Sequence, residues 1–149
     1  MATIPLPTEF QELLKSLNTH NAEYLLIGGF AVGYHGYPRT TGDLDIWIAR
    51  TPANAPQVSG ALQAFGFSKD DVPADMFLEP NRVLRIGNPP LRIALLTDIS
   101  GVNFADCWLC RETAEFDSIL VNIIDAQSLK VNKKASGRFK DLSDLENLS

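Results

Sequence analysis

The sequence is poor in the residues that build disulfide frameworks and zinc centres, with two cysteines and two histidines among 149 residues. Cys107 and Cys110 form a single Cys-x-x-Cys pair, at most half of a zinc ligand set, so we expect two partly buried thiols. No apolar run approaches the roughly 20 residues that a membrane-spanning helix needs. The first residues lack a positive segment followed by an apolar one, so the sequence predicts no secretory leader and a reducing, cytoplasmic location.

Positive charge is also scarce: 13 Lys and Arg residues stand against 18 Asp and Glu, a formal net charge of −5. This balance argues against non-specific binding to nucleic acid. The positive charge that is present gathers in residues 130–140, KVNKKASGRFK, which hold five basic residues and no acid. This segment could bind a compact polyanion such as a triphosphate, or it could be an ordinary solvated helix face.

The length and an apolar fraction of 45% predict one globular domain over residues 1–149. Apolar residues at helical spacing follow Thr8, which we expect to cap a helix. Alternating or short apolar runs predict the strands. Helices are expected over 8–19, 30–35, 57–67, 101–110, 125–134 (capped by Asp125) and 138–148, and strands over 23–27, 43–49, 82–86, 91–97 and 118–123. This mixture predicts an α/β or α+β fold.

The strand expected at 43–49 has carboxylates on one face. Side chains alternate across a strand, so Asp43 and Asp45 point the same way, about 7 Å apart along the backbone. Like charges this close repel unless a cation lies between them, and Mg²⁺ takes carboxylate and phosphate oxygens. The alternative is a pair of aspartates that only face water. Trp47 shares their face and could stack on a base, but we expect it to pack in the core or in the wall of the site.

Gly28 and Gly29 follow the apolar run Tyr24–Ile27, where a strand enters a tight turn before a helix. Such a turn exposes backbone N–H groups, and glycine allows a ligand to approach without a Cβ in the way. The known glycine motifs do not fit, because there is no G-x-G-x-x-G and Gly33 is followed by Tyr34 rather than Lys. The pattern therefore indicates a different arrangement for phosphate and metal.

The whole stretch YLLIGGFAVGYHGYPRTTGDLDIWI resembles the signature of the DNA polymerase β-like nucleotidyltransferase superfamily. It looks most like the small bacterial branch that includes toxin–antitoxin and abortive-infection proteins. The tail SLKVNKKASGRFKDLSDLENL is similar to the terminal segment of that branch. The resemblance implies a nucleotidyltransferase fold with a mixed β-sheet flanked by helices. It also implies transfer of a nucleoside monophosphate to a hydroxyl group, with release of pyrophosphate.

The resemblance assigns roles to individual residues. Gly28 and Gly29 would hold the phosphates of a nucleoside triphosphate. Asp43 and Asp45 would be the catalytic, metal-binding pair, holding Mg²⁺ as two ions in a fully active enzyme. Arg39 would lie near the phosphates or form a structural salt bridge. Lys133 and Lys140 match basic positions of the tail and would neutralise the triphosphate. The acceptor could be RNA, protein or a small molecule, and a protein partner or second copy could complete its site.

One position departs from the family. A third carboxylate is expected in a segment like PPLRIxLLT, where this sequence has Ala94. Alanine can neither ligate metal nor accept a proton, and Asp98 lies roughly 13 Å further along the strand. Three functions therefore stay open: an active nucleotidyltransferase, a catalytically impaired nucleotide-binding or partner-binding antitoxin or regulator, and a structural module with a vestigial acidic pair. His35, close to the proposed site, is expected to be packed and hydrogen-bonded.

Overall fold

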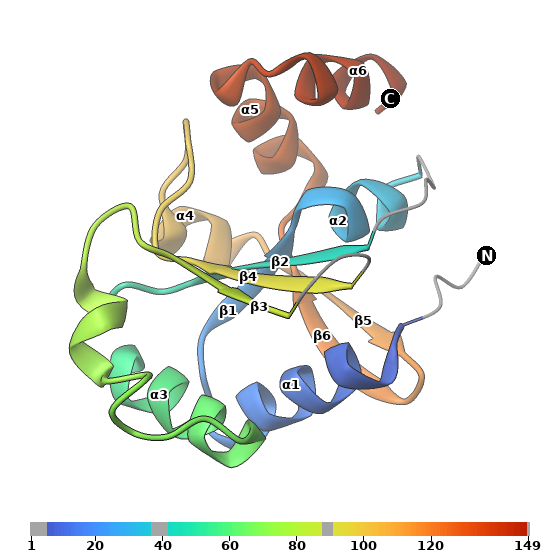
Figure 1. Ribbon diagram of the computed structural model, residues 1–149. Helices are drawn as coiled ribbons and strands as arrows, with labels where there is room; N and C mark the ends of the chain where they lie inside the picture. The colour runs from blue at the N-terminus through green and yellow to red at the C-terminus, as the bar shows by residue number, and fades with distance from the viewer. Residues whose placement is uncertain (1–5, 37–41, 88–90, 149) are drawn as a thin grey trace.

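A computed structural model describes residues 6–36, 42–87 and 91–148 (Figure 1). The described chain forms six strands and six α-helices, together with a 3₁₀ helix at Ala74–Leu78. The strands are β1 (Tyr24–Ile27), β2 (Asp43–Ile48), β3 (Val83–Ile86), β4 (Arg92–Leu96), β5 (Glu112–Phe116) and β6 (Ile119–Ile123). The α-helices are α1 (Thr8–Thr19), α2 (Gly28–Tyr34), α3 (Asn54–Phe65), α4 (Phe104–Leu109), α5 (Ala126–Ser136) and α6 (Phe139–Asn147).

All six strands belong to one mixed sheet, in the order β3-β4-β2-β1-β6-β5. The central strand β1 runs antiparallel to β2 and parallel to β6, while β2 runs parallel to β4. The outer strands β3 and β5 pair antiparallel with β4 and β6. The predicted mixed sheet flanked by helices is therefore confirmed.

Helices cover the two faces of the sheet unequally. Helices α1 and α3 pack on one face, and α2, α5 and α6 lie on the opposite side (Figure 1). The α1 side is a continuous apolar core, because α1 presents the fully buried residues Phe10, Leu13, Leu14 and Leu17 at helical spacing. On β2, Leu44 and Ile46 are buried and Asp43 and Asp45 are half-buried. The alternation of β2 thus assigns the carboxylates to the face opposite α1.

Element boundaries differ from the sequence prediction at a few places. Helix α1 begins at Thr8, with Pro7 at the capping position and no side-chain cap, so the prediction of a Thr8 cap was wrong. Helix α3 begins at Asn54, earlier than expected, and the Asn54 amide joins the backbone of Glu23 and Ala49. Strand β5 was not predicted. The Asp125 cap of α5 is confirmed, since its carboxylate accepts a hydrogen bond from the Ser128 N–H at 3.1 Å.

Candidate functional site

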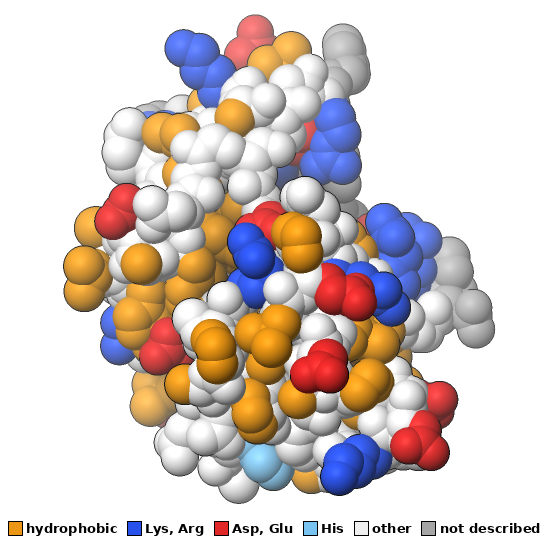
Figure 2. All heavy atoms as spheres, turned by 90° about the vertical axis from the view of Figure 1, so that its left-hand side faces the viewer, with side chains coloured by type: hydrophobic (Ala, Val, Ile, Leu, Met, Phe, Trp, Pro, Cys, Tyr) orange, Lys and Arg blue, Asp and Glu red, His pale blue; other side chains and the backbone are white. Residues whose placement is uncertain are grey.

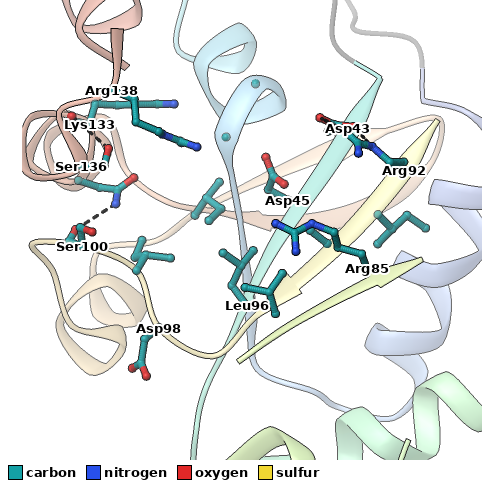
Figure 3. A pocket seen from close by; sticks show the side chains of 18 of the residues that line it. Asp43, Asp45, Arg85, Arg92, Leu96, Asp98, Ser100, Lys133, Ser136 and Arg138 are labelled. Carbon is teal, nitrogen blue, oxygen red and sulfur yellow. Dashed lines mark hydrogen bonds and ion pairs between the residues drawn. The ribbon is translucent and has the colours of Figure 1, made fainter. Parts of the chain in front are cut away.

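A cleft of about 610 Å³ opens on the sheet face opposite α1. Its floor is formed by β2, β3 and β4, and its walls by the Gly28–Gly29 turn and by residues of α5 and the α5–α6 turn (Figure 3). Gly28, Gly29, Asp43, Asp45 and Lys133, all predicted from the sequence, line it. The structure therefore brings the glycine turn, the acidic pair and part of the basic tail to one place.

Gly28 and Asp45 are in direct contact. Ile27 pairs with Asp45 across β1 and β2, so the chain enters the glycine turn beside that carboxylate. Gly28 has φ +67°, and a Cβ at this position would collide with Asp45 Oδ2. Only glycine combines this left-handed backbone with the space that the carboxylate occupies.

Asp43 lies at the start of β2 and forms an ion pair with Arg92. Arg92, its partner in the parallel pairing of β2 with β4, places Nε 3.2 Å from Oδ1 and a terminal nitrogen 3.4 Å from Oδ2 (Figure 3). Both side chains are about two-fifths exposed, so water screens the pair and its energy is modest. A cation that binds Asp43 would compete with Arg92 for the carboxylate. Arg92 was not among the predicted site residues.

Ala94 lies beside Asp45 in the sheet. It pairs with Asp45 on one side and with Arg85 of β3 on the other, so the three share one row across the strands. Arg85 points into the cleft (Figure 3). Asp98 also lines the cleft, but it accepts a hydrogen bond from the Asn81 N–H at 2.7 Å and pairs with Arg50 at 3.4 Å. The row that faces Asp45 therefore holds an alanine and an arginine instead of a third carboxylate.

Lys133 lies in a buried ion cluster at the junction of α5 and α6. Its Nζ is 3.0 Å from Asp141 Oδ1 and 3.2 Å from Asp144 Oδ2, and all three side chains are at most 5% exposed. Asp141 also accepts hydrogen bonds from Ser136 at 2.7 Å and from Arg138 at 2.6 Å. The ammonium group of Lys133 thus joins two helices, although the residue also lines the cleft.

Arg138 is the cation of this cluster that faces the cleft. Its side chain is 74% exposed, and it extends from the α5–α6 turn toward the strands (Figure 3). Hydrogen bonding to Asp141 raises the pKa of the Arg138 guanidinium. Burial lowers this pKa, but the negative charges of Asp141 and Asp45 raise it further, so the net shift is upward. Sequence reasoning noted Arg138 only as part of the basic segment. The signal that could have selected it is its place directly after Gly137, at a helix–helix turn.

Asp141 of this cluster is ionised at neutral pH. Burial raises the pKa of the Asp141 carboxyl, but hydrogen bonds from Arg138, Ser136 and Lys133 outweigh burial and hold that pKa well below its usual range. Asp141 therefore keeps its charge and positions Arg138 over the cleft.

The remaining sequence predictions fall outside the cleft or outside the described residues. Arg39 lies outside the described residues, and so does the side chain of Lys140. Cys107 and Cys110 are free thiols; Cys107 is buried, which raises its pKa, but Cys110 is exposed, so the expectation of a partly buried thiol was wrong for Cys110. The expectation for His35 is confirmed, since its Nε2 lies 2.7 Å from the carbonyl oxygen of Ile124.

The acidic pair fits one hard cation. Two carboxylates share a strand face and both line the cleft, and the absent Cβ of Gly28 leaves the space that the Asp45 carboxylate occupies. Across the ranges 6–36, 42–87 and 91–148, no group of three or more His, Cys, Asp or Glu side chains could hold a metal ion. The chain's own described donors therefore suit Mg²⁺ that takes further oxygens from a ligand or from water.

Comparison with known proteins identifies the fold. No protein-family model and no curated protein sequence matches the chain. Solved structures do match over most of its length, and they define it as a nucleotidyltransferase fold. The resemblance seen in the sequence is therefore confirmed at the level of the fold.

Three of these structures are informative. The lincomycin-bound lincosamide antibiotic adenylyltransferase LnuA is 14% identical, with a TM-score of 0.55 over 97% of this chain and 96% of its own. A candidate nucleotidyltransferase from Thermotoga maritima is 12% identical, with a TM-score of 0.61 over 91% and 87%. An antigenic nucleotidyltransferase-like protein from Paracoccidioides brasiliensis is 16% identical, with a TM-score of 0.52 over 97% and 76%.

Proposed function

We propose that the cleft binds a nucleoside triphosphate together with Mg²⁺ and transfers the nucleoside monophosphate to a hydroxyl group of an acceptor. The observation that carries the proposal is the contact between Gly28 and Asp45. Mg²⁺ binds carboxylate and phosphate oxygens together, so this chemistry requires a phosphate-binding glycine turn next to a carboxylate. Gly28 and Asp45 are in contact in this way.

The charges around the cleft support the same function. A triphosphate brings several negative charges, and Arg138, Arg92 and Arg85 all line the cleft. Guanidinium groups bind phosphate oxygens in pairs of parallel hydrogen bonds, which favours arginine over lysine for this task. Asp43 and Asp45 would hold Mg²⁺, which neutralises phosphate charge and polarises the phosphorus when bound. The proposed phosphate contacts of Gly28 and Gly29 complete the set.

The kind of acceptor is proposed from the chemistry of the transfer and from one structural neighbour. The neighbour LnuA is described as an adenylyltransferase for a lincosamide antibiotic, a small molecule. By this analogy of fold, we favour a small-molecule acceptor over RNA or protein. Ala94 removes one carboxylate that could take the proton of the acceptor hydroxyl, so we assign that proton to water. The toxin–antitoxin branch, a protein partner or homodimer and the cytoplasmic location stay predictions.

Calorimetric titration of the full chain with each nucleoside triphosphate, with Mg²⁺ and with EDTA, tests nucleotide binding. We expect Mg²⁺-dependent binding of at least one triphosphate, and its loss in the double variant Asp43→Asn/Asp45→Asn. The matched control is Asp70→Asn/Asp71→Asn, which removes the same charge from exposed residues that do not line the cleft. Equal binding by the wild type and the Asp43/Asp45 variant would refute the proposal.

Incubation with α-labelled triphosphates and a cell extract tests transfer. Label should reach an acceptor with wild-type protein and fail to do so with Asp43→Asn/Asp45→Asn. Binding without any transfer would instead support the impaired, regulatory alternative that Ala94 suggests.

A further inference from the structure

A second hollow of about 490 Å³ lies at the other end of β2 from Asp43. Its walls come from Trp47, from the segment after β2 and from helix α4, with Phe104, Trp108 and Leu109 among the lining residues. Nothing in the proposed function so far uses it. Its volume falls within the range of small-molecule sites.

Aromatic rings dominate this hollow. The ring of Phe104 meets the Trp47 ring edge-on at 5.0 Å and stacks on the Trp108 ring at 5.7 Å. The guanidinium of Arg111 lies 3.8 Å from the centre of the Trp108 ring, and Leu109 is 83% exposed. Figure 2 faces the side of the molecule on which α4 lies and shows hydrophobic side chains gathered among charged ones. Such walls favour a flat, uncharged ring.

A buried donor gives independent support for a ligand. Trp47 is 2% exposed, and within the described part of the chain its indole N–H has no hydrogen-bond partner. A buried N–H without an acceptor is destabilising, so native structures rarely keep one without a reason. A ligand with an acceptor oxygen could satisfy this donor if the Phe104 ring moves aside.

The hollow adjoins the proposed nucleotide cleft. Trp47 follows Asp45 by two residues on the same face of β2, and its neighbour across the strands, Leu96, lines the cleft. Asp98 lines both spaces. The Arg50 and Asp98 side chains at this rim pair with each other and compensate each other's charge, and the exposed Glu23 is a further charged residue of the lining. A molecule seated against Trp47 would therefore lie roughly 7 Å along β2 from Asp45, the nearer member of the acidic pair.

We infer that this hollow binds the acceptor, and that the acceptor is an uncharged small molecule in which a flat ring carries a hydroxyl group. The inference rests on the proposed function, because it supplies the second substrate of that reaction. The hydroxyl oxygen would form a bond to the α-phosphorus of the triphosphate, and the bond from that phosphorus to the bridging oxygen of the β-phosphate would break. Pyrophosphate leaves, and the hydroxyl proton passes to water.

The chain provides its own reporters for a test. It contains two tryptophans, and both line this hollow. A ¹H–¹⁵N spectrum of the labelled full chain therefore has two indole N–H signals, which the variant Trp108→Phe assigns. Benzyl alcohol serves as the probe, and glycerol is the hydroxyl compound without a ring. We expect saturable shifts of both indole signals with benzyl alcohol and none with glycerol, with the same result when Mg²⁺–ATP is present.

Two variants test the location. Leu109→Asp places a charge on an exposed lining residue at no cost to the core, and it should weaken benzyl alcohol binding about tenfold. Leu120→Ala changes an exposed leucine of β6 outside the hollow and should leave binding unchanged. Both variants should bind Mg²⁺–ATP as the wild type does.

The outcomes separate this inference from the proposed function. If benzyl alcohol shifts neither indole signal, or glycerol shifts them equally, the acceptor site is refuted even where Mg²⁺–ATP binds. Competition between benzyl alcohol and Mg²⁺–ATP would assign the hollow to the nucleotide base and also refute it. If benzyl alcohol binds but no triphosphate does, the proposed function fails, and the hollow is then a ring-binding site with no part in transfer.

Discussion

The Asp45 carboxylate occupies the space that a side chain at position 28 would need. Replacing Gly28 by alanine would push this carboxylate away and strain a backbone with φ +67°. We expect Gly28→Ala to weaken Mg²⁺–ATP binding at least tenfold and to lower the free energy of unfolding by about 1 to 3 kcal/mol. Calorimetry and urea denaturation measure the two effects.

Gly66→Ala is the matched control for backbone strain. Gly66 also has a positive φ of +132°, but nothing lies within 4 Å of where its Cβ would stand. The control should lose stability and keep Mg²⁺–ATP binding. Equal weakening of binding in both variants would show that strain alone, rather than the displaced carboxylate, explains the effect.

Ala94 offers a change in the opposite direction. An aspartate at this position would stand beside Asp45 and could supply a third carboxylate to Mg²⁺. We expect Ala94→Asp to raise Mg²⁺ affinity about tenfold, because cation affinity rises with the number of charged ligands. Arg85 pairs with position 94 from the other side and would compete for the new carboxylate, so Arg85→Gln should enlarge the gain.

Titration with Mg²⁺ alone measures this affinity, and Ala94→Asn controls for side-chain size without charge. No gain with Ala94→Asp, in either Arg85 background, would show that position 94 does not face the cation.

At the scale of the elements, the α5–α6 pair depends on the buried cluster of Lys133, Asp141 and Asp144. Removing one partner of a buried ion pair leaves the other charge without compensation and typically costs about 3 to 5 kcal/mol. We expect Asp141→Asn to lower the free energy of unfolding by that amount, as measured by urea denaturation at neutral pH. Asp106→Asn, a change at an exposed aspartate of α4, is the control.

The same carboxyl makes stability depend on pH. The pKa of Asp141 is lower in the folded chain than the usual value of about 3.9, so the folded state holds this proton less tightly. The contribution is complete above about pH 5 and is lost as the pH falls toward the folded pKa. Asp141→Asn should therefore lose less stability than the wild type between neutral pH and about pH 3. Parallel losses would mean that other carboxyl groups set the acid sensitivity.

How far the sequence predicted these elements depended on local signals. The α1 spacing, the alternation of β2 and the Asp125 cap are properties of neighbouring residues, and each was confirmed. Strand β5, with the sequence ETAEF, has two glutamates and lies at the edge of the sheet, so its pattern carried little apolar signal. The early start of α3 involves tertiary hydrogen bonds. The Asn54 side chain donates to the backbone carbonyls of Glu23, just before β1, and of Ala49, just after β2.

The site divides in the same way. The Gly28–Gly29 turn and the Asp43–Asp45 pair form a contiguous motif that could be recognised in one stretch. Arg85 and Arg92 reach the cleft through strand pairing, so no local pattern marked them, whereas Arg138 had one local signal in its place directly after Gly137. Sequence could likewise not show that Lys133 is held by two aspartates of the next helix.

At the scale of the whole molecule, the cleft lies between the sheet and the α5–α6 pair, so a bound nucleotide would contact both. Ligand that binds only the folded chain stabilises it by about 2.7 kcal/mol at 100 times its Kd. We expect Mg²⁺–ATP to raise the midpoint of thermal unfolding by several degrees, about the shift that such energies give a domain of this size. Differential scanning calorimetry measures it, and EDTA should abolish the shift. An unchanged midpoint under saturating Mg²⁺–ATP would contradict the proposed binding.

No helix in the described part of the chain is both long and apolar enough to cross a membrane.

The helices on the site side are short and are held in place by specific contacts with the segment that follows β4. Gly101 illustrates this, because a Cβ there would stand 2.6 Å from Ala135 of α5, and the neighbouring Ser100 carbonyl accepts a hydrogen bond from Asn132 at 3.0 Å. The segment after β4 thus connects the floor of the cleft to its upper wall.

The strand order has a consequence for folding of the chain during its synthesis on the ribosome. Strand β1, buried at every position, is synthesised well before its parallel partner β6, which follows much later in the sequence. Until residues 119–123 emerge, one edge of this apolar strand has no partner in the sheet. Pairing between segments so distant in the chain is slow, and open apolar edges invite contact with other molecules. The nascent chain therefore passes through a period of exposure that ends only when residues 119–123 have been synthesised and have paired with β1.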